Sequence, residues 1–95
     1  MEKPYDIKLR TFQYACDAAC AYPKKKMDPG SQRIWLQFLA AATSGGAHLE
    51  EAEAAASRIH FVTLARGSLR ELRESNYWIR IIDATKLEGW EKAGH

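Results

Sequence analysis

The 95-residue sequence predicts an all-α protein, an up-and-down antiparallel four-helix bundle whose fourth helix is short or truncated. Two observations predict this fold. Apolar residues recur every three or four positions, which is the spacing of one helix face, and no useful stretch alternates with the period of two that a strand needs. Capping and turn residues divide the chain, a single domain over residues 1–95, into helices at about 6–22, 31–53, 57–83 and 86–93.

The first helix is expected to begin at Asp6, which can accept hydrogen bonds from free backbone amides, and to end before Pro23. Cys16 and Cys20 lie four residues apart on it, where their bond directions do not suit a disulfide. Both are therefore expected as small, reduced core residues. The apolar stripe of this helix is Leu9, Phe12, Cys16 and Ala19.

The loop over residues 24–30 begins with three lysines, which we expect to be solvated. It ends in Asp28, Pro29 and Gly30, a combination that favours a turn. Ser31 is then the expected cap of the second helix.

The second helix should be the most buried element, because it is apolar nearly all round as far as Ala42. Its large apolar residues include Trp35 and Phe38. Gly45 and Gly46 follow, although glycine costs about 1 kcal/mol in a helix interior. The pair therefore predicts either a break in the helix or a very close approach of another helix, and we favour the close approach.

The third helix, capped by Ser57, carries two stripes over about seven turns. One is apolar and should face the bundle: Val62, Ala65, Leu69, Leu72 and Ile79. The other is the candidate contact surface: Arg66, Arg70, Arg73, Tyr77 and Arg80. A capping-box pattern from Thr85 to Glu88 predicts the start of a fourth helix of about two turns, docked through Leu87 and Trp90.

The arginine stripe has two interpretations. In the first its side chains are solvated, with Arg70 paired to Glu74 one turn on, a contact that contributes only about 0.2–0.5 kcal/mol. In the second the stripe binds phosphate groups, which arginine contacts through two parallel hydrogen bonds. The formal net charge of +2 permits a nucleic-acid partner without requiring one.

Enzyme chemistry finds no support in the residue pattern. A di-iron bundle needs Glu-x-x-His pairs, and neither His48 nor His60 has a glutamate three residues before it. Cys16 and His48 are a poor nucleophile pair, because an apolar helix face does not favour a thiolate. We therefore expect a protein that is not an enzyme, with no catalytic, cofactor-binding or metal-ligating residues and no cofactor. The absence of a signal-peptide pattern and of an 18-residue apolar run predicts a cytoplasmic protein without a membrane partner.

Three segments resemble one family in a single register over about residues 5 to 87. The run from Gln37 to Ala52, QFLAAATSGGAHLEEA, is similar to the second-helix motif of bacterial four-helix bundle proteins related to those encoded in 23S rRNA intervening sequences. The third-helix pattern is matched by Ser57, Phe61, Glu71, Glu74 and Tyr77-Trp78-Ile79-Arg80. The first helix is matched by Tyr5-Asp6 and Arg10-Thr11-Phe12.

The resemblance implies an antiparallel four-helix bundle with no established catalytic residues. A related branch, the accessory proteins of diversity-generating retroelements, forms pentameric rings and binds a reverse transcriptase and nucleic acid through basic surfaces. The resemblance therefore implies a homo-oligomer, a pentamer by analogy with that branch, with RNA, DNA or a reverse transcriptase as partner. Three departures stand out: His48 where the family usually has asparagine, Gly67 where it has an apolar residue, and a fourth helix that is not full length.

Together these observations predict a non-enzymatic, oligomeric binding or accessory protein that contacts nucleic acid or a nucleic-acid enzyme. The alternative is a structural or protein-interaction module that self-associates through an exposed apolar groove, left open by the short fourth helix, without binding nucleic acid.

Overall fold

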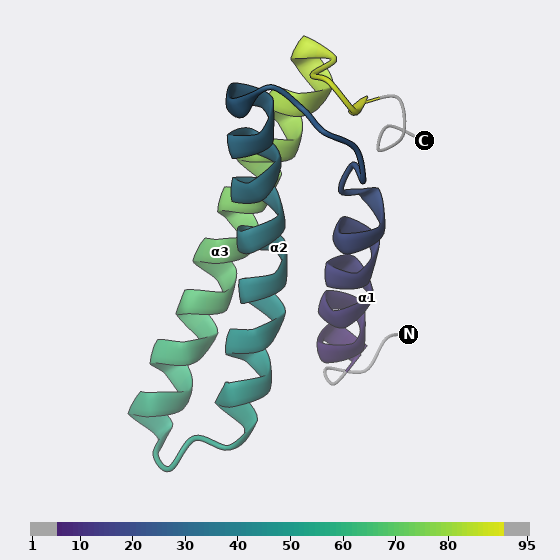
Figure 1. Ribbon diagram of the computed structural model, residues 1–95. Coiled ribbons are helices and arrows are strands. Elements are labelled where there is room, and N and C mark those ends of the chain that lie inside the picture. Colours follow the sequence, from purple (N-terminus) through teal and green to yellow (C-terminus); the bar gives the residue numbers. More distant parts are fainter. Residues whose placement is uncertain (1–5, 91–95) are drawn as a thin grey trace.

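The computed structural model describes residues 6–90, and within them the chain forms three helices (Figure 1): α1 over Asp6–Ala21, α2 over Pro29–Glu53 and α3 over Arg58–Thr85. α1 and α3 run in one direction, and α2 runs in the opposite direction (Figure 1). The described part contains no strand. The all-α class predicted from the sequence is confirmed.

The segment expected to start a fourth helix instead ends the third. Thr85 belongs to α3, and its hydroxyl donates to the carbonyl of Ile81 at 2.8 Å instead of capping a new helix. Lys86 then adopts a left-handed conformation with φ 50°, and the amides of Lys86 and Leu87 donate back to carbonyls of α3. This is the Schellman arrangement that terminates a helix. Residues 91–93 of the expected fourth helix lie outside the described residues, so a four-helix bundle is not shown.

The start of α2 differs from the expectation, whereas the start of α3 agrees with it. Asp28, not Ser31, caps α2: its carboxylate accepts the Ser31 amide at 3.0 Å and the Ser31 hydroxyl at 2.7 Å. Pro29 occupies the first turn, where its missing N–H has no helical partner to lose. Ser57 caps α3 as predicted, by accepting the His60 amide at 3.0 Å. The Asp-Pro-Gly sequence thus begins a helix and is not a free turn. The Asp6 side chain, expected to cap the first helix, lies outside the described part.

The cap of α2 gives the stability of the protein a pH dependence. The Ser31 amide and then the Ser31 hydroxyl stabilise the ionised carboxylate, which lowers the pKa of Asp28 below its usual range. A lowered pKa in the folded state contributes stability that is present above the unfolded-state pKa of about 3.9 and is lost as the pH falls through the folded-state pKa. We expect Asp28→Ala to lower the melting temperature at pH 7, and the difference from wild type to shrink steadily below about pH 4. Thermal unfolding followed by circular dichroism checks this, and a difference that stayed constant down to pH 2 would contradict it.

The hydrophobic core lies at one end of the molecule, where the start of α2, the end of α3 and the turn after α3 meet (Figure 1). Its buried members are Ala18, Met27, Trp35, Phe38, Ala42 and Ile82. Trp35 is fully buried and donates its indole N–H to the carbonyl of Glu88 at 2.7 Å. Its ring meets those of Tyr22 and Phe38 edge to face, at centroid distances of 6.4 and 6.1 Å. Trp35 therefore joins α2 to the C-terminal turn, as its place in the most apolar segment suggested.

Small residues form the rest of the contact between α2 and α3. The Ser68 hydroxyl donates to the carbonyl of Gly45 at 2.6 Å, so the two backbones lie close together. A methyl group on Gly45 would lie 2.7 Å from side-chain carbons of Leu72. The predicted close approach at the glycine pair is confirmed. Farther along this contact the His48 ring packs on Gly67, where a methyl group would lie 3.5 Å from the imidazole. The two residues that depart from the family pattern therefore lie against each other.

The buried face of α3 is not the one that its large apolar residues predicted. The buried residues of α3 are Gly67, Ser68, Ser75 and Ile82. The expected stripe lies beside them: Leu72 and Ile79 are half-buried, and Leu69 is 51% exposed. Small side chains let the helix backbones approach, and the larger ones are displaced to the edge of the contact.

The buried face of α1 was also predicted wrongly. Ala18 is buried, and a methyl group on Gly46 would meet the Thr11 carbonyl at 3.5 Å, so α1 rests its small-residue face on α2. The expected core stripe lies on the outer side and is exposed: Leu9, Phe12, Cys16 and Ala19. Cys16 and Cys20, expected in the core, are both exposed.

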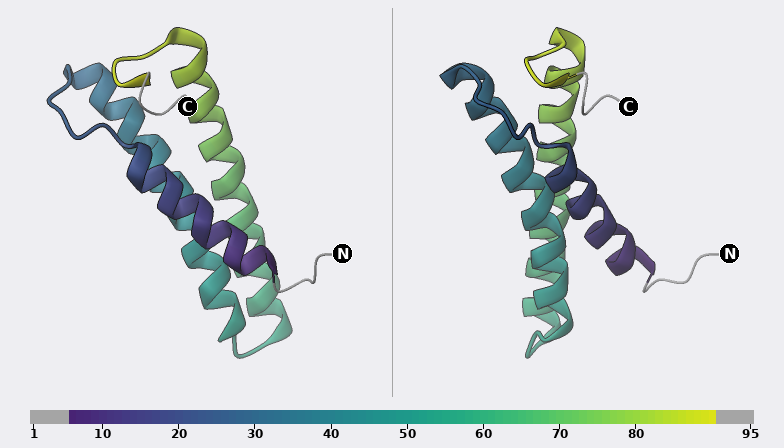
Figure 2. Two further views of the ribbon diagram at one scale, coloured as in Figure 1. Left: turned by 90° about the vertical axis from the view of Figure 1, so that its right-hand side faces the viewer. Right: turned by 45° about the vertical axis from the view of Figure 1, so that its right-hand side comes forward.

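The molecule is elongated, since its longest extent of 44 Å is close to the length of the 28-residue α3 at 1.5 Å per residue. α1 crosses the α2–α3 hairpin at an angle instead of lying along it (Figure 2). Its radius of gyration is 14.7 Å, whereas a compact domain of this length has about 12 Å. α1 packs mainly on α2. Its link to α3 is a hydrogen bond of 2.9 Å between the hydroxyl oxygens of Tyr14 and the fully buried Ser75. Ser75 donates its own proton to the carbonyl of Leu72, so Tyr14 is the donor to Ser75.

Candidate nucleic-acid interface

The structure places all members of the predicted arginine stripe on the outer face of α3. They are exposed and lie in one line: Arg66, Arg70, Arg73, Tyr77 and Arg80. At 100° per residue this line is opposite the buried line of Ser68, Ser75 and Ile82. With a rise of 1.5 Å per residue, the 14 steps from Arg66 to Arg80 make the stripe about 21 Å long. The stripe is therefore a straight surface that faces away from α2.

The positive charges of the stripe are not neutralised within the described residues. None of its four arginines forms an ion pair there, and the expected pair between Arg70 and Glu74 is not formed. Glu74 instead accepts a hydrogen bond from the indole N–H of Trp78 at 3.1 Å. Asp83, farther along α3, similarly accepts the indole N–H of Trp90 at 2.8 Å. Glu74 and Asp83 therefore bond with tryptophan indoles and not with the arginines, so the guanidinium groups of the stripe are not engaged by these two carboxylates.

Tyr77 adds an exposed aromatic ring to the basic line. Its ring is 53% exposed and meets the half-buried Trp78 ring edge to face at 5.5 Å. The Arg80 guanidinium carbon lies 5.9 Å from the centre of the Tyr77 ring. Of the two aromatic residues, Trp78 is the one that packs against the core. An exposed aromatic ring among arginines is the combination on which unpaired bases stack.

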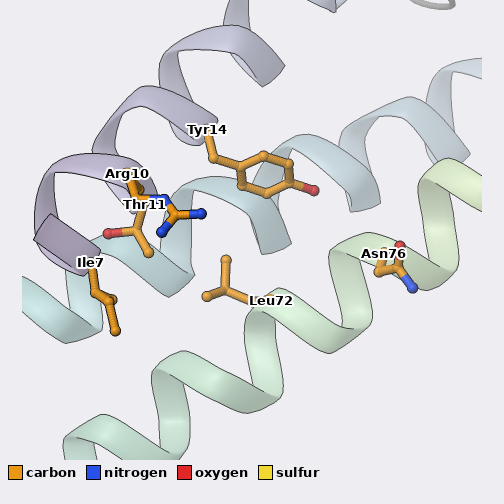
Figure 3. A pocket seen from close by; sticks show the side chains of 6 residues that line it. All are labelled: Ile7, Arg10, Thr11, Tyr14, Leu72 and Asn76. Atoms are coloured by element: carbon orange, nitrogen blue, oxygen red, sulfur yellow. The ribbon is translucent and has the colours of Figure 1, made fainter. Parts of the chain in front are cut away.

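An open groove lies between α1 and α3, with a volume of about 580 Å³. Figure 3 shows the side chains that line it: Ile7, Arg10, Thr11, Tyr14, Leu72 and Asn76. Leu72 projects from α3 toward α1, and Tyr14 projects from α1 toward α3 (Figure 3). Sequence reasoning assigned no residues to this groove, because Tyr14 of α1 and the nearby Ser75 of α3 are 61 residues apart and neither belongs to a recognisable motif.

Among residues 6–90 no group of three or more His, Cys, Asp or Glu side chains could hold a metal ion. His48 uses Nδ1 in a 2.9 Å hydrogen bond with the carbonyl of Ser44, one turn earlier on α2. Lys8 joins α1 to the end of α2 through Glu53, at 2.6 Å, and the hydrogen bond with this carboxylate raises the pKa of Lys8.

The search for a membrane-spanning element in the same part of the chain also gives a negative result, since none of its helices is long and apolar enough to cross a bilayer. The arginine stripe and the groove between α1 and α3 are two candidate functional surfaces of the described part of the chain. No family model, no curated protein and no solved structure matches the chain.

Proposed function

We propose that this protein is a non-enzymatic, oligomeric accessory protein that binds RNA or DNA through the outer face of α3. The observation that carries the proposal is the line of four exposed arginines that lack an acidic partner in the described part of the chain. Arginine binds phosphate through two parallel hydrogen bonds, and each contact releases counterions from the nucleic acid. A nucleic-acid enzyme such as a reverse transcriptase as a further partner rests on the family resemblance alone.

Reversing three charges of the stripe tests the proposal. We expect Arg66→Glu/Arg70→Glu/Arg73→Glu to weaken binding of a fluorescein-labelled single-stranded RNA and of a DNA duplex at least 10-fold, measured by fluorescence anisotropy. Four phosphate contacts predict that the logarithm of the wild-type binding constant falls with the logarithm of salt concentration at a slope of about −3. The triple variant should show a slope close to zero. Tyr77→Ala should weaken binding to the single strand more than to the duplex, since stacking requires unpaired bases.

The lysine triplet supplies a matched control. Lys24→Glu/Lys25→Glu/Lys26→Glu changes the net charge by the same amount at an exposed loop between α1 and α2. If the stripe is the binding surface, this variant retains most of the affinity. An equal loss in the two triple variants would show that net charge alone is responsible and would overturn the role of α3.

The groove between α1 and α3 favours a second candidate function, a structural module that self-associates and does not bind nucleic acid. Ile7 and Leu72 give the groove apolar walls, and Ile7 is 54% exposed. This candidate predicts a mass in static light scattering that rises with protein concentration, together with no anisotropy change for either nucleic acid. A monomer at every concentration would exclude it.

A further inference from the structure

The outer side of α1 carries an exposed apolar stripe that the groove and the basic face do not use. We define the α1 stripe as Leu9, Phe12, Cys16, Ala19 and Cys20. Leu9 and Phe12 are 56% and 58% exposed, although both are large apolar side chains. Their spacing of three and four residues continues through Cys16 and Ala19, which is the spacing of a helix-pairing seam. This spacing is typical of a helix face that a partner covers, but in a single copy of the chain the face is exposed.

The α1 stripe is uncharged, which restricts what can cover it. Lys8 lies at its edge, but its ammonium group is held by Glu53 and Glu50 at 2.6 and 3.6 Å. A second copy of this chain can therefore approach the stripe without repulsion between like charges. An approach of two copies through their arginine stripes would instead bring eight positive charges together.

The two halves of the α1 stripe are complementary in size. Leu9 and Phe12 form a large half toward the start of α1, whereas Cys16, Ala19 and Cys20 form a small half toward its end. When two such helices pair in antiparallel order, the level of Leu9 coincides with that of Ala19 in the second copy, and Phe12 with Cys16. Large residues then fall opposite small ones at these two levels, as knobs-into-holes packing requires, and Cys20 falls at the level of Lys8 at the edge. Parallel pairing would place the large residues together and leave the small residues facing a gap.

The surface extends from the α1 stripe onto α2. A hollow of about 260 Å³ beside Phe12 is lined by Ala15 of α1 and by Thr43, Gly46, Ala47 and Glu50 of α2. The 16-residue helix α1 is about 24 Å long. Stable complexes bury about 1,200–2,000 Å² in total, so one helix seam needs this additional surface.

From these observations we propose that a second copy of this chain packs on the outer face of α1, with the two α1 helices antiparallel about a two-fold axis. Each Phe12 lies against Cys16 of the other copy, and the hollow between α1 and α2 receives neighbouring side chains. The contact is isologous and closes on itself, so it gives a dimer and not a ring. Both arginine stripes stay free, because they lie on α3.

Mass in solution tests the dimer. Sedimentation velocity between about 1 and 300 µM should show wild type changing from monomer to dimer, and Phe12→Glu should raise the dimer dissociation constant at least 10-fold. Ile59→Glu is the matched control, since Ile59 is 80% exposed on α3 and should leave the dissociation constant unchanged. Circular dichroism of each variant reports whether the fold is kept. A wild-type monomer at all concentrations, a dimer indifferent to Phe12→Glu, or a larger ring would each overturn the proposal.

Disulfide trapping tests the antiparallel order. Antiparallel pairing places the two copies of Cys16 about 6 Å apart along the helix axes. Together with the lateral separation of the two helices, this distance exceeds the reach of a disulfide. We therefore expect Cys20→Ser alone to give no covalent dimer on mild oxidation, and Phe12→Cys/Cys20→Ser to give one at high protein concentration. Crosslinking of Cys20→Ser alone would indicate parallel pairing and would overturn the antiparallel arrangement.

The dimer and the two candidate functions can fail separately. The triple arginine variant should remain dimeric, and a nucleic-acid assay that fails leaves the sedimentation result unchanged. Self-association through the groove between α1 and α3 would respond to Asn76→Trp, which fills that groove, and not to Phe12→Glu. That outcome would assign the second copy to the groove and overturn the proposal for the α1 stripe.

Discussion

Replacing Trp35 with alanine should lower the free energy of unfolding by about 3–5 kcal/mol. Trp35 is fully buried, and the substitution also leaves the Glu88 carbonyl without its 2.7 Å hydrogen bond. Small domains are stabilised by about 0.05–0.15 kcal/mol per residue, so this loss is a large part of the total. The residues after Lys86 should lose their attachment to α2 at the same time. Urea denaturation at 25 °C measures the change.

Two controls separate burial from the hydrogen bond in the Trp35 variant. Trp35→Phe keeps most of the apolar volume and removes the indole N–H. It should lower the free energy of unfolding by about 1–3 kcal/mol, which is the cost of one lost buried hydrogen bond. Leu36→Ala removes the adjacent side chain, which is 46% exposed, and should cost much less. Equal losses for Trp35→Ala and Leu36→Ala would contradict the position of the core.

Replacing Gly45 with valine should destabilise the protein by about 3 kcal/mol, whereas Gly46→Ala should stabilise it by about 0.5–1 kcal/mol. The first methyl group at position 45 would lie 2.7 Å from Leu72 and 3.4 Å from the Ser68 carbonyl, so α2 and α3 must separate or Leu72 must move. A methyl group at position 46 meets the Thr11 carbonyl at 3.5 Å, an ordinary contact. Adjacent glycines therefore give effects of opposite sign, measured by urea denaturation.

The cause of the Gly45 effect can be checked independently. Ala40→Val introduces the same branched side chain at an exposed position of α2 and should cost only the difference in helix propensity, less than about 0.7 kcal/mol. Adding Leu72→Ala to Gly45→Val should restore part of the lost stability, because it removes the carbon atoms that the new side chain meets first. Additive losses in the double variant would indicate that Leu72 is not the obstacle.

Sequence reasoning predicted the helices better than the faces they bury. The bounds of α1 and the cap of α3 follow from local signals, such as Pro23 after the first helix and Ser57 before the third. Those signals act within a few residues and depend little on the rest of the chain. The close approach at Gly45 was also predictable, because glycine in a helix interior needs a packing reason.

The buried faces of the helices were harder to predict. Apolar periodicity shows which residues would be stabilised by burial, but it does not show how many neighbouring helices are available to bury them. α1 has one face of small residues and one of large apolar residues, and a single copy can bury only one of them on α2. The face of small residues is the one that packs on α2, because Ala18 and Thr11 permit the two backbones to approach near Gly46. The exposed stripe containing Cys16 was therefore mistaken for the core.

The arginine stripe is the part of the candidate site that the sequence located. Helical spacing alone is sufficient to place Arg66, Arg70, Arg73 and Arg80 on one face, and the structure places them there. Whether Glu74 would neutralise Arg70 could not be read from the spacing, because Glu74 also has Trp78 as a neighbour one turn away and bonds with it instead.

The position of the core at one end has a consequence for the motions of the molecule. Between residues 43 and 68 the buried residues are all small, namely Gly45, Gly46, Ala52, Gly67 and Ser68. Transient opening of the hairpin tip exposes no fully buried large side chain, so it requires less free energy than opening near Trp35. Arg66 lies in this loosely held half, whereas Arg80 lies beside the core. The arginine stripe is therefore anchored at the Arg80 end and compliant at the Arg66 end. In the proposed function, such a surface would follow the curvature of a bound strand without unfolding the protein.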